Sequence, residues 1–227
     1  RSPSRGLGDV YKRQLLRKPA NKPAPVTFTA GLKALREPAL LTLGAVAFFY
    51  NYGFFTLLAY SPYPIDEAAA ASGSEFGATE LGWVFFGWGL ALAVSSVFVA
   101  PRLTQSFGLM PVICTVLIGF AILLAALGFT VDHLSTLIVL VILAGFFSGI
   151  FNTVLTEAVM EATDLPRNVA SSTYSGLRFL GGAIAPAISG PVAAAFGSGV
   201  PYWAGAGALA VSLIILVAGR GALKRLL

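Results

Sequence analysis

Six long apolar runs, each nearly free of charged residues, constrain this chain more than any other feature of its sequence. The hydrocarbon core of a bilayer is about 30 Å thick, and a helix needs roughly 20 apolar residues to cross it. Backbone polar groups in lipid must be paired within the segment, so these runs are expected to be helices. The chain is therefore predicted to be all-α and transmembrane, with a six-helix bundle over residues 38–220. The predicted spans are residues 39–61, 81–101, 110–131, 134–156, 169–193 and 200–218.

Composition agrees with a membrane protein and argues against other classes. Of the residues, 56% are hydrophobic and 11% charged, whereas a soluble domain carries about 25% charged residues. Of the net charge of +5, residues 1–14 carry +3, and the other basic residues lie between and beside the apolar runs, so no nucleic-acid partner is expected. The single cysteine, Cys114, lies inside an apolar run and is expected to be a small buried hydrophobe. The sequence contains no metal-ligand cluster or phosphate-binding loop, so no metal or cofactor is expected.

The positions of Lys and Arg predict how the spans are oriented. The loops after the first, third and fifth spans contain neither residue, and the loop at residues 63–80 is acidic. Because cytoplasmic loops are enriched in Lys and Arg, both termini are predicted to be cytoplasmic in a plasma membrane. The basic residues outside the spans, from residue 15 onward, are Arg17, Lys18, Lys22, Lys33, Arg36, Arg102, Arg167, Arg220, Lys224 and Arg225.

The segments outside the bundle are predicted to have different origins. Residues 4–14, SRGLGDVYKRQ, resemble the translation of a transposon-end sequencing adapter, so residues 1–14 are expected to be non-native. The chain also begins without Met, and we expect a reading frame cut by the end of a DNA fragment. Residues 15–37 are predicted to be a cytoplasmic linker with a short amphipathic helix whose Leu32 and Leu35 face inward. Residues 221–227 are predicted to be a cytoplasmic tail.

Four stretches carry a resemblance to a known family. They resemble helices seven, eight, ten and eleven of bacterial major facilitator superfamily transporters of the drug:proton antiporter type. The resemblance implies that the chain is the C-terminal half, helices seven to twelve, of a twelve-helix fold. The stretches are ALREPALLTLGAVAFFYNYGFFTLLAYSP (34–62), LGWVFFGWGLALAVSSVFVAPRL (81–103), GFFSGIFNTVLTEAVME (145–161) and NVASSTYSGLRFLGGAIAPAISGP (168–191).

The resemblance implies a secondary active transporter, as an isolated half, that works by alternating access. Proton-coupled efflux of small organic compounds or drugs by a bacterial protein is the expected activity. The expected partners are membrane lipid, a small-molecule substrate, protons and the missing N-terminal half. Two alternatives remain: uptake of a metabolite or sugar by the same fold, and a complete six-helix protein that acts as a homodimer.

An intramembrane serine protease is the enzyme alternative, and the sequence disfavours it. Such an enzyme would need a Gly-x-Ser-Gly motif and a membrane-embedded histidine. Residues Phe146–Gly149 spell FFSG, and the single histidine, His133, falls in a loop. No enzymatic activity and no catalytic residue are therefore expected.

Candidate substrate-cavity residues lie on the first and fourth spans. Tyr50, Asn51 and Phe54 offer an aromatic wall with one amide, which suits an apolar or cationic compound, although aromatic residues are also ordinary packing residues. Asn152 and Thr156 share a helical face with Gly145 and Gly149 at spacings of four, three and four. That face could pack on another helix or line a cavity. The resemblance favours the cavity for Asn152, because the family's tenth helix lines the substrate path.

Arg178 is the charged residue inside the fifth predicted span. It lies nominally ~13 Å from the cytoplasmic end, at 1.5 Å per residue, and an intramembrane charge is typically functional. It could bind an acidic group, bind an anionic substrate or take part in proton coupling. Alternatively, it could cap carbonyl groups or pair with Glu157. Glu157, at the end of the fourth span, could couple to protons or form an interfacial gate or ion pair.

Small residues and prolines are predicted to allow bending or close packing of the fourth and fifth helices. A flexible fifth span suits rocking between inward-facing and outward-facing states. The residues concerned are Gly145, Gly149, Gly181, Gly182, Pro186, Gly190 and Pro191.

Overall fold

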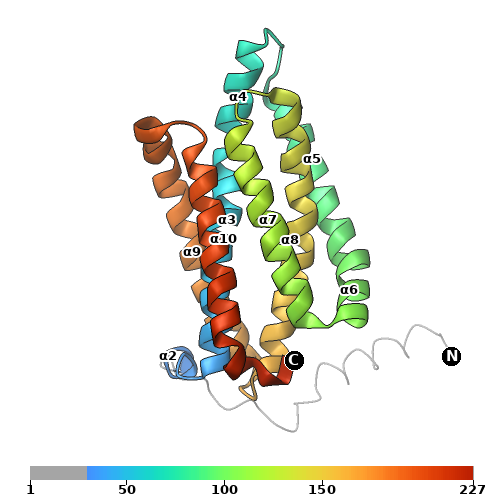
Figure 1. Ribbon diagram of the computed structural model, residues 1–227, viewed down its shortest axis with the longest axis vertical. Helices are drawn as coiled ribbons and strands as arrows, with labels where there is room; N and C mark the ends of the chain where they lie inside the picture. Colours follow the sequence, from blue (N-terminus) through green and yellow to red (C-terminus); the bar gives the residue numbers. More distant parts are fainter. Residues whose placement is uncertain (1–29, 227) are drawn as a thin grey trace, which may run out of the picture. The chain divides into compact units, whose positions relative to one another are not determined.

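The computed structural model describes residues 30–226, and every regular element in that range is helical (Figure 1). Six of its continuous helical stretches are long and apolar enough to cross a membrane, which confirms the predicted all-α, six-helix class. The adapter-like segment and linker residues 15–29 lie outside the described residues. The elements are α2 (Ala30–Ala34), α3 (Pro38–Tyr60), α4 (Pro62–Ala71), α5 (Ala78–Val94), the π-helical η1 (Ser95–Val99), α6 (Ala100–Phe107), α7 (Leu109–Phe129), α8 (Leu134–Ala162), α9 (Arg167–Phe196), α10 (Val200–Ala218) and the 3-10 segment η2 (Gly219–Leu226).

The long helices pack as a series in the order α9, α3, α10, α7, α8, α5, and α3 also meets α8 at the centre. Within residues 30–226 this series does not close, because α9 and α5 stand on opposite flanks and do not pack on each other (Figure 1). Both flanking helices expose large apolar side chains, including Phe86 and Leu90 on α5 and Phe179 and Leu180 on α9. The bundle therefore leaves two helices with much of their surface uncovered by the described chain.

Glycines set the closest helix contacts. A Cβ atom at Gly145 would collide with the backbone of Trp88 on α5, and one at Gly181 would collide with the backbone of Phe48 on α3. Gly149 and Gly182 likewise face neighbouring helices at short range, whereas a Cβ at Gly190 would meet nothing within 4 Å. The absence of a side chain at the first four positions lets α8 approach α5 and lets α9 approach α3.

The variant Gly145→Ala is expected to lower the free energy of unfolding by about 1–3 kcal/mol, the usual cost of overpacking a tight interior. Thermal unfolding in detergent, followed by tryptophan fluorescence, measures the change. Gly207→Ala on α10 is the matched control, because its added methyl meets nothing within 4 Å. Equal midpoint shifts for the two variants would contradict the packing role.

The prediction of an acidic loop at residues 63–80 is wrong for the first half of that range, because the chain continues as the helix α4 to Ala71. Pro62 starts this helix, and proline is tolerated in a first turn because the amide there needs no helical partner. The run Ala68–Ala71 then has the highest intrinsic helix propensity. The result is a helical projection that carries Asp66 and Glu67 beyond the long part of α3.

A π-helical turn, not predicted from the sequence, interrupts the second span at Ser95–Val99. Pro101 follows it, and a proline removes one helical hydrogen bond and crowds the carbonyl four residues earlier. The Ala100 amide donates to the Ser95 carbonyl, which is the longer bond of a π turn. The extra residue in this turn accommodates Pro101 without ending the helix.

The fourth span is longer than predicted, because α8 continues to Ala162. A hydropathy pattern ends at the first charges, but Ala158, Val159 and Ala162 stay buried, so packing stabilises the extra turns. Glu161, which follows the predicted end of this span at residue 156, therefore lies in the last turn of α8. Leu32 is 75% exposed, which overturns the expectation that it faces inward: α2 is a single short turn and offers it no core.

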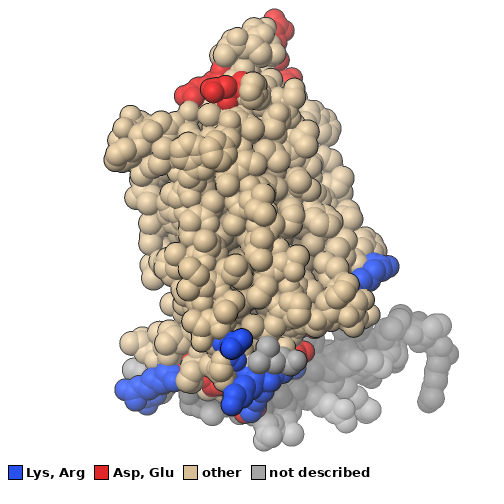
Figure 2. Space-filling model, in the orientation of Figure 1, with Lys and Arg blue, Asp and Glu red and all other residues tan. Residues whose placement is uncertain are grey.

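Charge separates the two ends of the bundle (Figure 2). In this view the visible Lys and Arg atoms gather toward the end that holds η2, with some acidic atoms among them, whereas the end that holds α4 shows acidic atoms without basic ones. A hydrogen bond and an ion pair tie the basic end together. Thr163 donates to Glu37 Oε2 (2.8 Å), and Arg225 pairs with Asp164 (2.6 Å). Hydrogen bonding to Arg225, together with its charge, lowers the pKa of the exposed Asp164 carboxyl.

Candidate functional site

Arg178 on α9 meets Asn51 on α3, a residue 127 positions earlier in the chain. The Arg178 Nε donates to the Asn51 Oδ1 at 3.2 Å. Asn51 is fully buried, and its Nδ2 donates to the Ala47 carbonyl at 2.9 Å, which fixes the direction of the side-chain oxygen. The guanidinium carbon also lies 5.7 Å from the centre of the Phe179 ring. The guanidinium of Arg178 is therefore positioned by the side-chain amide of Asn51 and by the ring of Phe179.

An aromatic cluster lies beside Asn51. The Tyr50 ring stacks on Phe151 of α8 with centroids 3.9 Å apart, and it lies 5.9 Å from Phe54. Tyr50 and Phe54 are both buried, so in this structure they are packed inside the bundle instead of lining an open wall.

The polar residues of α8 are more accessible than the aromatic cluster. Asn152 is half-buried. Thr156 is exposed, and its hydroxyl donates to the backbone carbonyl of Asn152 at 2.7 Å. The neighbouring Thr153 shares a 2.5 Å hydrogen bond with Ser96 in the π-helical turn. Gly145 and Gly149 pack on α5, whereas Asn152 is half-buried and Thr156 is exposed. The face predicted from these four residues therefore packs on a helix at one end and is accessible at the other.

Glu157 forms no ion pair with Arg178 within the described residues. It is exposed and lines a cavity of about 340 Å³ at the basic end, together with Glu161 and Arg225. The salt bridge within residues 30–226 is the Arg225–Asp164 pair, so the described chain contains no Glu157–Arg178 ion pair. Pro186 and Pro191 lie inside the continuous helix α9.

Comparison with known proteins decides the family. Residues 40–224 match the Major Facilitator Superfamily. The chain belongs to that superfamily. Over 189 residues it is also 42% identical to the multidrug efflux protein YfmO of Bacillus subtilis (strain 168), in a match that covers 83% of this chain and 46% of the relative. This major facilitator chain thus spans about half the length of the curated relative it matches.

Two buried polar groups near the aromatic cluster escaped sequence reasoning. The Tyr50 hydroxyl and the Trp88 indole N–H are buried without a hydrogen-bond partner among the described residues, and the Trp88 ring lies 5.9 Å from Phe54. An unpaired buried donor costs about 1–3 kcal/mol, so a polar atom that reached either group would be stabilised. Trp88 could have been noticed, because an indole N–H within a membrane span usually needs a partner.

Within this superfamily member, the site combines a fixed cation, a fixed amide and stacked rings from three helices. Such a set can bind a polar or aromatic organic molecule by charge, hydrogen bonding and ring contact. Residues 30–226 hold no group of three or more His, Cys, Asp or Glu able to bind a metal.

Proposed function

We propose that this chain is the C-terminal six-helix half of a secondary transporter that exports small organic compounds in exchange for protons. The observation that carries the proposal is the Arg178–Asn51 hydrogen bond, which joins two long helices inside the bundle. Membership of the Major Facilitator Superfamily and the efflux function named for the Bacillus relative support it. The share of that relative which the chain spans supports the half-transporter interpretation.

In this proposal, alternating access exposes a site near the middle of the membrane to each side in turn. Asn51, Asn152 and Thr156 provide its polar contacts, and Tyr50 and Phe54 become accessible when α3 and α8 separate. The prolines within α9 allow this helix to bend, and we assign it the role of the moving wall. Helix α9 also carries Arg178, so movement of the wall changes the surroundings of the charge.

Proton coupling requires a group that titrates, and an arginine keeps its charge at every physiological pH. Arg178 therefore serves as the fixed cation that an acidic group from the other half approaches and leaves. Glu157 is the carboxylate proposed to take part from this chain, at the basic end. Protonation of the acidic group from the other half weakens its attraction to Arg178 and permits the helices to move.

Ethidium efflux from a drug-sensitive bacterium tests the proposed function. The cells express this chain together with the part of the Bacillus relative that lies outside the matched residues. We expect faster efflux than in cells with an empty vector, and a protonophore should abolish the difference. Accelerated efflux that persists after the proton gradient collapses would contradict proton coupling, and accelerated ethidium uptake would contradict export.

The basic end of the bundle is proposed to face the cytoplasm. Cysteine labelling in intact cells tests this orientation in a Cys114→Ser background. A membrane-impermeant maleimide should label Ser74→Cys at the acidic end and should leave Lys224→Cys at the basic end unlabelled until the cells are opened. Both positions are exposed in the structure. The reverse labelling pattern would overturn the orientation.

A further inference from the structure

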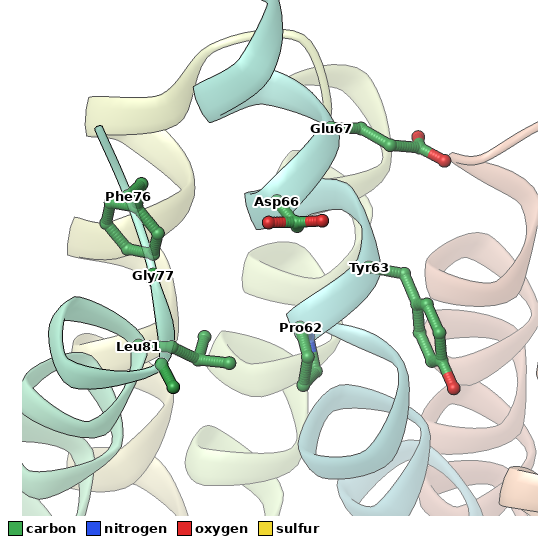
Figure 3. A pocket seen from close by; sticks show the side chains of 8 residues that line it. Pro62, Tyr63, Asp66, Glu67, Phe76, Gly77 and Leu81 are labelled. Atoms are coloured by element: carbon green, nitrogen blue, oxygen red, sulfur yellow. The ribbon is translucent and has the colours of Figure 1, made fainter. Parts of the chain in front are cut away.

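A cavity of about 510 Å³ opens at the acidic end of the bundle, between α3 and α4 on one side and α9 on the other. Its lining includes Tyr60, Tyr63 and Glu67. A second cavity of about 360 Å³, shown in Figure 3, borders α4 and the start of α5 and shares Tyr63 and Glu67 with the first. Neither cavity includes Arg178 or Asn51, so this end of the bundle offers a site separate from the one described above.

Two tyrosine rings form the aromatic part of the larger cavity. Their centroids are 6.1 Å apart and their planes meet at 32°. The Tyr60 hydroxyl donates to the Ser198 carbonyl at 2.9 Å, and its side chain is buried, so its ring is fixed in place. Tyr63 is 65% exposed, and its ring is available to a ligand. A cation near the face of such rings is attracted by their quadrupole.

The carboxylate of Glu67 supplies negative charge at the same place. Figure 3 shows Tyr63 and Glu67 extending from α4 to the same side, while Asp66 lies nearer Phe76 and Leu81. The sequence contains no Lys or Arg between Arg36 and Arg102 or between Arg178 and Arg220, and these two stretches provide both walls of the larger cavity. Glu67 and Asp66 also form no salt bridge within the described residues.

Aromatic faces beside an unpaired carboxylate suit an organic cation better than a metal ion. The described residues hold no group of three or more metal-binding side chains, and hard metal ions need several oxygen ligands. The cavity volume falls within the range of about 300–1,000 Å³ that is typical of sites for drug-sized molecules. We propose that this cavity binds lipophilic organic cations between the exposed ring of Tyr63, which lies beside the buried Tyr60, and the carboxylate of Glu67.

The inferred binding has a consequence for transport. If the basic end faces the cytoplasm, the cavity lies where an exported compound leaves the protein. Its role as an exit site rests on the proposed export function, whereas binding itself does not.

Calorimetric titration of the whole chain in lipid nanodiscs with tetraphenylphosphonium tests the proposal, with empty nanodiscs subtracted. Glu67→Gln and Tyr63→Ala are each expected to weaken binding by about three- to tenfold, in keeping with typical cation–π and partly exposed charge interactions. Tyr63→Phe should bind as the original chain does, because it keeps the ring and loses only the hydroxyl. Tetraphenylborate, an anion of the same shape, should bind more weakly than the cation.

Control variants separate this site from other sources of binding. Asp132→Asn removes an acidic residue at the same end that lines a different cavity, and it should leave tetraphenylphosphonium affinity unchanged. Both Tyr63 and Glu67 are exposed, so their variants are expected to fold. Absence of binding, or equal affinity in the original chain, Glu67→Gln and Tyr63→Ala, would overturn the proposal. Binding as predicted alongside failed ethidium efflux would retain this site and reject the export function.

Discussion

Replacing Arg178 with alanine is expected to reduce ethidium efflux by about tenfold or more, because hydrogen bonds to charged groups are worth about 1.5–3 kcal/mol and 1.4 kcal/mol corresponds to a factor of ten. The substitution removes the cation that Asn51 holds at 3.2 Å. Efflux is measured in cells that express both parts of the transporter, with rates divided by the amount of protein in the membrane. Arg178→Lys should recover only part of the rate, because lysine lacks the planar group that Asn51 and Phe179 contact.

Membrane insertion does not account for the expected loss. An arginine at the centre of a span opposes insertion by about 2.5–3.5 kcal/mol, so Arg178→Ala should insert at least as well as the original chain. Arg167→Ala is the matched control, because Arg167 begins the same helix and is exposed at the basic end. If Arg178 acts through Asn51, adding Asn51→Ala to Arg178→Ala should cause little further loss. Full efflux by Arg178→Ala at normal protein levels would make Arg178 a structural residue.

The second large effect is expected when the chain is separated from the rest of the proposed transporter. The series of helices from α9 to α5 leaves both flanks with exposed apolar side chains. A complementary half would cover these flanks and supply the opposite wall of the proposed substrate cavity. We therefore expect the chain to co-purify with the part of the Bacillus relative outside the match. Efflux by the chain alone should stay at the vector background.

A charge on the uncovered surface tests whether the flanks form the contact. Ile184→Arg places a cation on the exposed part of α9, where Ile184 is 39% exposed, and it should reduce co-purification. Ile122→Arg on α7 is the matched control. Ile122 is also exposed, but α7 lies inside the series between α10 and α8. Equal loss of co-purification for both variants would place the contact elsewhere or indicate a general defect.

Sequence periodicity and hydropathy predicted the membrane class because lipid imposes a strong requirement on backbone pairing. The ends of the spans were harder to predict. Helix α8 continues past Thr156 because its apolar residues pack at the basic end, and α4 forms because Pro62 fits a first turn. Neither cause depends on average hydropathy.

The sequence predicted which residues belong to the candidate site better than it predicted which of them contact one another. The sequence pointed to Arg178 and Asn51 separately, because charge and amide groups are costly within a membrane. Their hydrogen bond depends on how α9 packs against α3, and such a long-range contact leaves no local pattern. Glu157, one of the alternative partners considered for Arg178, lines a cavity at the basic end instead. The cavity lined by Tyr60, Tyr63 and Glu67 could not be predicted from the sequence, because it requires α4 to be a helix that faces α9 across the cavity.

Transport by purified protein in sealed vesicles tests the half-transporter proposal most directly. The chain is reconstituted alone and together with the complementary part of the Bacillus relative, and ethidium movement is followed after a pH gradient is imposed. We predict gradient-dependent transport only when both parts are present, and its loss with Arg178→Ala. Transport by this chain alone at the rate of the combined parts would contradict the proposal.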